Sequence, residues 1–244
     1  MAVVKVVVMN SSVRIILLVA LTVLIGASFM KWPRYGNTDN TELIKSVSFS
    51  SQGQMQTVTL TKVSGDAFAG SRILRGSSEA PVRVVVFIDF QCPACAEFAK
   101  TAQAQIKSEF VDTGKIRLAF RDFPLPQHLN AQQAALAAAC ANVENRWDAM
   151  YDLLFASQDA WRDFSSKSFK SQLIVYAKQL GLDSNAFQTC LTSQQFSKAI
   201  QRDVNAGDAI KIDSTPTLTI AGYSVSGALP IEGYRAILAK FGVR

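Results

Sequence analysis

The stretch that most limits the choice of fold runs from residue 82 to residue 110. Residues 82–90 read VRVVVFIDF, a nearly continuous apolar run that is typical of a strand buried on both faces of a sheet. Pro93 can open a helix at little cost, because the backbone N–H at that position has no partner within a helix, and a helical pattern continues to residue 110. A buried strand that leads directly into a helix favours an α/β fold.

Further strand and helix patterns surround this unit. Residues 56–63 alternate and are β-branched, which predicts an edge strand, and residues 115–120 predict the strand that follows the first helix. From 130 to 209 the patterns are helical, as in the alanine-rich AQQAALAAACANV and the apolar stripe of RWDAMYDLLFASQ. The second half of the chain therefore opens with a block of helices.

The end of the chain returns to strands. Two short strands are predicted at 217–220 and 223–225, and Pro230 opens a last helix. The predicted order is β, β, α, β, a block of helices, β, β, α. We divide the chain into three parts. Residues 1–34 are a signal or anchor segment, and residues 35–75 are a polar tether (36–55) with the edge strand. Residues 76–244 are an α/β domain with a helical insertion at about 130–209.

The amino end has the pattern of a membrane anchor or a targeting signal, with a buried soluble helix as the remaining alternative. Residues 15–30 read IILLVALTVLIGASFM, without a charge, at the short edge of the roughly 17–25 residues that span a bilayer. An uncleaved membrane anchor and a cleaved secretory signal both fit this pattern, and no clear cleavage site of small residues decides between them. Either one places the bulk of the chain outside the cytoplasm, where disulfides persist.

Composition excludes several other classes of protein. The chain is 49% hydrophobic and 18% charged, so it can bury a sizeable core and is not of disordered type. The formal charge is +6, but the basic residues are scattered and do not alternate with aromatic residues. We therefore expect no nucleic-acid partner.

Two cysteines follow the buried strand at a spacing of three. Cys92 stands at the turn between strand and helix, where the first N–H groups and the positive end of the helix dipole favour thiolate over thiol. Cys95 lies one turn further on the same helix face, within reach of Cys92. The motif Cys-Pro-Ala-Cys, with Pro93 and Ala94 between the sulfurs, therefore predicts thiol–disulfide exchange. Half of a zinc site and a purely structural bridge are the alternatives, but the chain has one histidine and no second C-x-x-C.

A second motif, S-T-P-T, precedes the short strand at 217–220. The bond between Thr215 and Pro216 is a candidate for the cis form, because X-Pro bonds at the start of a strand adopt it more often than others. Beside the sulfurs, such a proline would present the carbonyl and N–H of Thr215 to an extended substrate. An ordinary trans proline at a strand start is the alternative.

These residues resemble a family, the DsbA-like thiol–disulfide oxidoreductases of the thioredoxin superfamily. The matching stretches are SSEAPVRVVVFIDFQCPAC, RDFPLPQHLNAQQAALAAACA, RWDAMYDLLFASQ and DSTPTLTI, which together cover about residues 76–244. The resemblance implies a thioredoxin fold with an inserted helical subdomain. It also implies that Cys92 is the nucleophile, Cys95 the resolving cysteine and Pro216 a cis-proline opposite them.

The chain departs from that family in two positions. The strongly oxidising branch has histidine where this chain has Ala94, and the loss of an imidazole predicts a weaker oxidant. Many thioredoxin-fold enzymes also have a buried acid six residues before the first cysteine, where this chain has Val86. Asp89 is interpreted as a loop or rim residue, which leaves the proton acceptor of Cys95 open.

Three further residues need an interpretation. Cys140 and Cys190 lie in the predicted helical block, and some DsbA-like relatives carry a second bridge there, so the resemblance implies a structural disulfide. Two buried free thiols and a second, regulatory redox pair are the alternatives. His128 is the sole histidine, and packing or surface placement is favoured over a role as catalytic base.

Together these patterns predict an extracytoplasmic enzyme that is either anchored to the inner membrane through residues 15–30 or secreted. It would exchange disulfides with protein substrates as a disulfide oxidase, and a membrane redox partner would renew its cysteine pair. No metal and no organic cofactor is expected. A reductase or isomerase, and a non-catalytic peptide-binding or chaperone module on the same fold, are the alternative functions.

Overall fold

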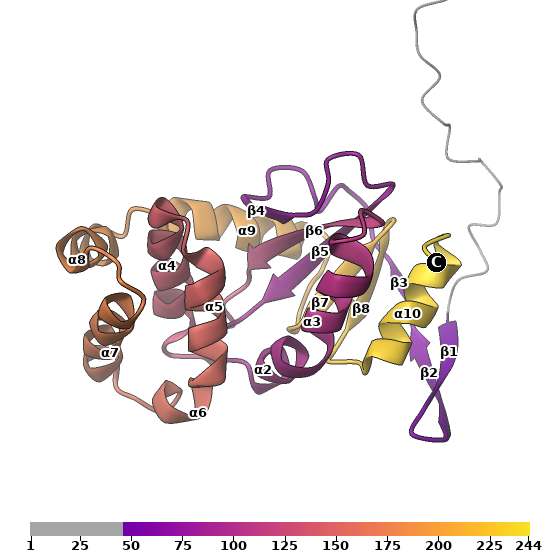
Figure 1. Cartoon of the computed structure of the whole chain (residues 1–244), viewed down its shortest axis with the longest axis horizontal. Helices are drawn as coiled ribbons and strands as arrows, with labels where there is room; N and C mark the ends of the chain where they lie inside the picture. The colour runs from indigo at the N-terminus through magenta and orange to yellow at the C-terminus, as the bar shows by residue number, and fades with distance from the viewer. Residues whose placement is uncertain (1–45) are drawn as a thin grey trace, which may run out of the picture. The chain divides into compact units, whose positions relative to one another are not determined.

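The central element of the fold is β5 (Val82–Ile88), seen in the computed structural model, which describes residues 46–244 (Figure 1). β5 pairs in parallel with β6 (Ile116–Asp122) and antiparallel with β7 (Thr217–Ile220). Six of its seven residues are buried, as the continuous apolar run predicts for a strand covered on both faces.

Three shorter strands extend the sheet on both sides. β8 (Tyr223–Ser226) and β3 (Thr61–Lys62) continue it beyond β7, and β4 (Ile73–Arg75) pairs with β6 at the other edge. The strand order is β3-β8-β7-β5-β6-β4. The edge strand predicted over 56–63 is therefore divided, and only its end joins this sheet.

The segment predicted as a tether is in part a hairpin. β1 (Ser46–Ser51) pairs antiparallel with β2 (Gln54–Thr59), so the prediction of a polar tether over 36–55 is wrong for residues 46–55. The reason is the alternation in SVSFSS: Val47 and Phe49 both point inward and are buried, and β1 contacts the last helix. Two apolar side chains two residues apart suffice to anchor a short strand.

The predicted helix after β5 is one helical segment with π-type turns inside it. It comprises α2 (Pro93–Phe98), η1 (Ala99–Gln103), α3 (Ala104–Ile106) and η2 (Lys107–Val111). The fully buried Phe98 contacts Tyr234 of α10 (Ile231–Lys240), with ring centroids 5.6 Å apart. Burying one such aromatic ring contributes about 1.5–3 kcal/mol, which fastens both helices over the same face of the sheet.

The opposite face of the sheet has its own small core. Phe87 of β5 packs edge to face against Phe123, which follows β6, with ring centroids 5.9 Å apart. Gly207 lies so close to this phenylalanine that a Cβ there would stand 2.5 Å from its ring. Successive residues of β5 thus supply two cores, which explains why the sequence shows no polar alternation there.

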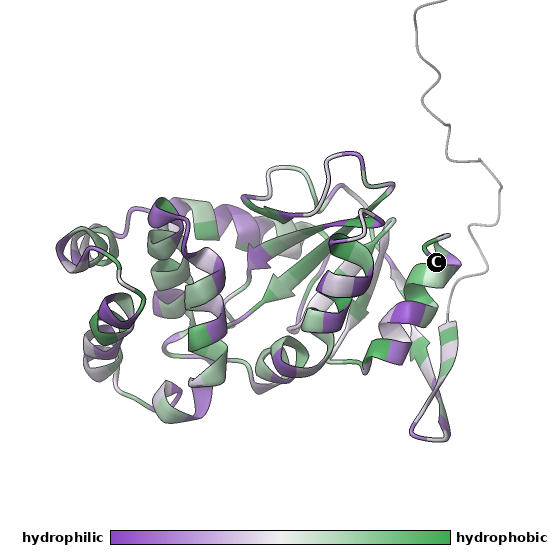
Figure 2. Cartoon of the chain, in the orientation of Figure 1, coloured by the Kyte–Doolittle hydropathy of each residue, from purple (hydrophilic) through white to green (hydrophobic). Residues whose placement is uncertain are grey.

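A block of helices separates the two halves of the sheet in sequence. Figure 1 shows most of it gathered beside the sheet, and Figure 2 shows the apolar residues of the helices and the central strands. The helices are α4 (Ala131–Ala141), η3 (Asn142–Glu144), α5 (Trp147–Ala156), α6 (Gln158–Trp161), α7 (Ser166–Gln179), α8 (Ser184–Ser193) and α9 (Ser197–Ala209). α9 returns to the sheet, where it contacts β6.

A disulfide fastens this block. Cys140 at the end of α4 is bonded to Cys190 of α8, with Cα atoms 5.9 Å apart. The loop between them spans 50 residues, for which the chain-entropy model gives about 4 kcal/mol of stabilisation. The N-cap of α8 is Asp183, whose carboxylate accepts hydrogen bonds from the N–H groups of Asn185 and Ala186.

Within residues 46–244, no helix combines the length and the apolar character needed to cross a bilayer. The predicted anchor or signal segment, residues 15–30, lies outside the described residues.

Candidate functional site

Cys92 lies at the N-cap of α2, immediately after the turn that follows β5. Its backbone is extended, with φ −72° and ψ 122°, and its carbonyl accepts hydrogen bonds from the N–H groups of Cys95 and Ala96 at 3.0 and 3.2 Å. Pro93 occupies the first helical position, as predicted. This geometry turns the sulfur toward the free N–H groups at the start of the helix.

The surroundings of Cys92 favour its thiolate. They lower the pKa of the Cys92 thiol from 9.0 to about 5, and a hydrogen bond with Cys95 is the largest cause. Burial opposes this effect, while the contact with Thr215 and hydrogen bonds from the backbone N–H groups of Ala94 and Cys95 add to it. At neutral pH the sulfur is therefore an anion, the form that attacks disulfides.

Cys95 has the opposite character. It is fully buried, and burial, followed by the hydrogen bond and the charge of Cys92, raises the pKa of its thiol well above 9.0. The backbone N–H of Asp89 points at its sulfur, at 3.4 Å. The pair therefore combines a charged outer sulfur with a protonated inner one. Neither cysteine is part of a disulfide in this structure.

The loop before β7 completes the site. The peptide bond between Thr215 and Pro216 is cis, and the Cys92 thiol donates to the Thr215 carbonyl at 3.1 Å. The topology explains this contact: β5 and β7 are antiparallel neighbours in which Phe87 pairs with Thr217, so the segment after β5 meets the segment before β7. Two motifs more than 120 residues apart in sequence become adjacent in this way.

The ligands of a zinc site are not assembled around the sulfurs. Across residues 46–244, no group of three or more His, Cys, Asp and Glu side chains is arranged to hold a metal ion. The second cysteine pair, Cys140 and Cys190, is bonded to itself in the helical block and does not take part in the site.

Two residues that sequence reasoning set aside belong to the site. Asp89 is not a rim residue: it is 1% exposed, and its carboxylate faces the ring of His128, with Oδ2 2.7 Å from Nδ1. The earlier interpretation failed because Asp89 follows a strand closely, and a loop position there is usually exposed. The sequence contained one signal, because an aspartate commonly forms a turn by accepting a hydrogen bond from the N–H two residues on. Asp89 accepts such a bond from the N–H of Gln91.

Two glutamines connect the cysteine turn to the helical block. Gln158 of α6 is buried and donates to the carbonyls of Phe90 and Cys92 at 2.8 and 3.0 Å. Gln91 donates to the carbonyl of Arg162 and accepts from the N–H of Asn130. No local pattern marks these residues, because their partners lie far away in the sequence.

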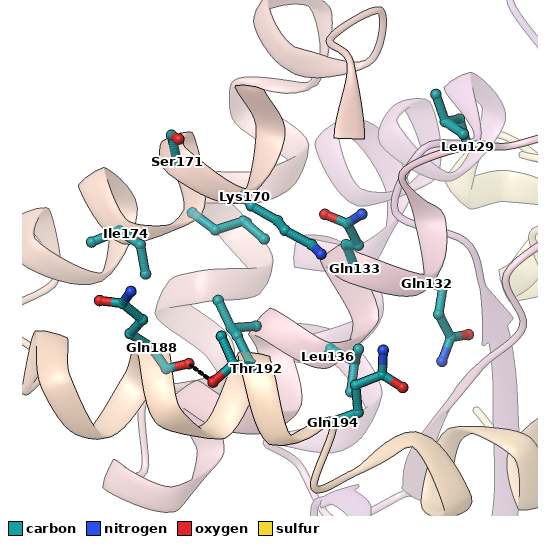
Figure 3. Close-up of a pocket in the computed structure, with 12 residues that line it drawn as sticks. Leu129, Gln132, Gln133, Leu136, Lys170, Ser171, Ile174, Gln188, Thr192 and Gln194 are labelled. Carbon is teal, nitrogen blue, oxygen red and sulfur yellow. Dashed lines mark hydrogen bonds between the residues drawn. The ribbon is translucent and has the colours of Figure 1, made fainter. Parts of the chain in front are cut away.

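Two hollows lie near this part of the fold. The first adjoins the start of α2 and is lined by residues of α2, η1, α5 and α6, among them Pro93 and Phe155. The second lies between α4, α7 and α8, and Figure 3 shows side chains from these helices around it. Its lining is mainly glutamine and leucine, with Lys170, and contains neither redox cysteine. Cys92 and Cys95 do not line the first hollow either, but Pro93, the residue after Cys92, does.

Comparison with known proteins agrees with this geometry. The family described as Thioredoxin matches residues 69–240. The chain is 29% identical to the probable disulfide bond formation protein D of Bacillus anthracis, over 60% of this chain and 68% of that protein. It is also 35% identical to the Na(+)/H(+) antiporter NhaA 3 of Salinispora tropica, over 67% of this chain. The chain spans only 24% of that antiporter's length.

Solved structures share the fold. BdbD from Bacillus subtilis, in its oxidised form, aligns with a TM-score of 0.64 and 21% identity, over 75% of this chain and 97% of that one. Alpha-DsbA1 from Wolbachia pipientis aligns with a TM-score of 0.62 and 23% identity, over 68% and 88% of the two chains. The chain belongs to the thioredoxin family, as a DsbA-like member of that superfamily.

Proposed function

We propose that this chain is an extracytoplasmic thiol–disulfide oxidoreductase that acts as a disulfide oxidase on protein substrates. The observation that carries the proposal is the contrast between the two sulfurs of the Cys-Pro-Ala-Cys motif. The pKa of Cys92 is lowered to about 5, while that of Cys95 is raised. An anionic sulfur that is a good leaving group, next to a sulfur held as thiol, is the arrangement that disulfide exchange requires.

In the proposed reaction the oxidised pair accepts electrons from a client with two thiols. A client thiolate attacks Cys92 Sγ, the bond between Cys92 and Cys95 breaks, and Cys95 leaves with the electron pair and then takes a proton. The second client thiolate attacks the client sulfur of the mixed disulfide, and Cys92 leaves as a thiolate. The client gains one disulfide, and the enzyme holds the two electrons as a reduced pair.

Thr215 and Pro216 have a binding role in this proposal. An extended client segment would pair with the backbone of Thr215 by strand addition, beside the attacking sulfur. The carbonyl of Thr215 already lies 3.1 Å from Cys92 Sγ, which places a client bound there within reach of the nucleophile.

The proposal also covers where the reaction takes place and what renews the cysteine pair. Residues 15–30 would anchor the chain or direct its secretion, and a redox partner in the membrane would re-oxidise the pair. The Cys140–Cys190 bridge supports a location outside the cytoplasm, because disulfides persist there. The probable disulfide bond formation protein D of Bacillus anthracis, whose name describes the same activity, adds support.

The test is a stoichiometric exchange with a reduced, unfolded client that has two cysteines. The oxidised full chain in detergent should become reduced as the client gains one disulfide, which alkylation and mass spectrometry measure. With a client that already carries a disulfide, Cys95→Ser should accumulate a mixed disulfide, because the Cys92 thiolate attacks that disulfide, one client sulfur leaves as a thiolate, and no resolving cysteine releases the product. If Cys92→Ser holds the client without exchange and the wild type does no more, the non-catalytic module is the correct function.

A redox titration against glutathione separates the oxidase from the reductase or isomerase. A pair as reducing as thioredoxin, at about −270 mV, would favour the reductase.

A further inference from the structure

Asp89 has a buried carboxylate that is held by three donors. Oδ1 accepts from the N–H of Gln91 at 2.7 Å, and Oδ2 accepts from the N–H of Leu125 at 2.8 Å. The Nδ1 atom of His128 lies 2.7 Å from the same Oδ2. The Asp89 side chain is fully buried, while that of His128 is 19% exposed. The sole histidine of the chain is thus placed against a buried acid at the edge of the redox site.

The backbone of Asp89 touches both redox cysteines. Its N–H donates to Cys95 Sγ at 3.4 Å, and its carbonyl accepts from the N–H of Cys92 at 3.1 Å. Any movement of this residue would therefore displace the donor that faces the resolving sulfur. The carboxylate fixes the residue from the other side, through the segment that contains Leu125 and His128.

A turn alone does not require a charge at this position. Burying a carboxylate costs several kcal/mol unless it is paired and hydrogen-bonded, and a neutral side chain could hold a turn at lower cost. Burial raises the pKa of Asp89, and the hydrogen bonds from Leu125, His128 and Gln91 oppose that rise.

We propose that Asp89 and His128 form a positioning pair for the resolving cysteine. By fixing the backbone of Asp89, the pair holds the N–H that stabilises Cys95 when it leaves as a thiolate. This inference rests on the proposed function and concerns its first step. When a client thiolate attacks Cys92 Sγ, the electron pair of the broken disulfide goes to Cys95 Sγ, and this N–H is the donor that meets it. The proton that Cys95 later takes comes from water.

Positioning and simple charge effects predict opposite signs for Asp89→Asn and the same sign for His128→Ala. If only charge mattered, Asp89→Asn would remove a negative charge and favour the Cys95 thiolate, while His128→Ala would leave the acid unpaired and disfavour it. If the pair positions the donor, both changes loosen the same N–H and shift the exchange in the same direction. The double variant should then be no worse than the stronger single variant, because the two residues act as one unit.

The experiment measures the full chain in detergent. The equilibrium constant with glutathione should shift about fivefold toward the oxidised chain in Asp89→Asn and in His128→Ala, which is about 20 mV for a two-electron couple. The rate at which glutathione opens the oxidised pair should fall by a similar factor. His128→Gln retains a donor and should recover part of both effects.

The matched control is Asp112→Asn, which removes the same charge from an exposed carboxylate 2.8 Å from Lys107 Nζ. It should leave the equilibrium constant and the rate unchanged. Shifts of opposite sign in Asp89→Asn and His128→Ala, or values equal to wild type, would overturn the positioning pair. If Asp89→Asn does not fold, the comparison of the two His128 variants replaces it: recovery by His128→Gln relative to His128→Ala supports the positioning pair, and equal values in both variants overturn it. A wild-type chain that performs no exchange refutes the proposed function instead.

Discussion

The two cysteine pairs of this chain share a chemistry and differ in almost everything around it. Cys92 and Cys95 are three residues apart at the start of a helix, unbonded, with their pKa values moved in opposite directions. Cys140 and Cys190 are 50 residues apart, bonded, and fasten α4 to α8. One pair is surrounded by N–H groups and a carbonyl, and the other lies within the packing of helices.

This difference indicates what makes a disulfide reactive or inert. A sulfur can leave or attack readily only where donors stabilise its anion, and Cys95 and the N–H groups at the start of α2 supply such donors to Cys92. All four cysteines are buried and belong to the same hydrophobic core, so burial by itself does not separate the two pairs. Long loop closure, rather than anion stabilisation, gives the Cys140–Cys190 bridge its effect.

The sharpest test of the contrast removes the outer sulfur. Cys92→Ser should reduce the rate of disulfide exchange by at least about 10³-fold, because the hydroxyl neither ionises nor forms a disulfide. The rate of client oxidation measures this. Retained exchange in the variant would show that another cysteine carries the reaction.

Removal of the second pair should have the reverse outcome. Cys140→Ser with Cys190→Ser should lower the free energy of unfolding by about 4 kcal/mol, since the unfolded chain regains the freedom of a long loop. Denaturant unfolding of both proteins measures this loss. Exchange by the folded variant should equal that of wild type, and a large loss of exchange would instead assign the second pair a redox role.

The pH dependence of the reduced protein should report Cys92 alone. Thiolate absorbance near 240 nm should rise with a midpoint at about pH 5, and the rate of attack on a small disulfide should follow it. Because this pKa lies below the ordinary 9.0, the reduced form gains stability as pH rises from about 5 to 9 and loses it as pH falls toward 5. The oxidised form, which has no Cys92 thiolate, is the control. A midpoint near 9 would contradict the proposed site.

The redox potential should lie between two known extremes. A Cys92 pKa of about 5 falls between the values of about 7 in thioredoxin and about 3.5 in DsbA, so we expect a potential between about −270 and about −120 mV. Ala94→His should raise it, since an imidazole beside the sulfur stabilises the thiolate. A wild-type potential as high as −120 mV, from a glutathione titration, would refute the prediction of a weaker oxidant.

The smallest expected effect concerns the helix that carries Cys190. Asp183→Ala removes the N-cap of α8 and should cost about 1 kcal/mol of stability without changing exchange. Asp183→Asn can still accept the N–H bonds of the cap, so it serves as the matched control. A change in redox potential would show that the two cysteine pairs are coupled through the helical block.

Local patterns anticipated the elements that depend on local physics. The apolar run before Cys92 predicted a buried central strand, Pro93 predicted the start of a helix, and the alanine-rich segment around Cys140 predicted a helix. The hairpin of β1 and β2 was missed, because only Val47 and Phe49 mark it among serines. Its burial depends on contact with α10, almost 200 residues later, which no local pattern reveals.

The sequence by itself determined that a thiolate would form at the N-terminus of a helix. The helix dipole, the proline at the first helical position and the spacing of the two cysteines are all effects of residues close together in the chain. Only the tertiary structure decided what surrounds that thiolate. Antiparallel pairing of β5 with β7 places the Thr215 carbonyl against Cys92, and the segment after β6 places His128 against Asp89. These contacts join residues 123 and 39 positions apart, and only the packing of the whole chain determines such distances.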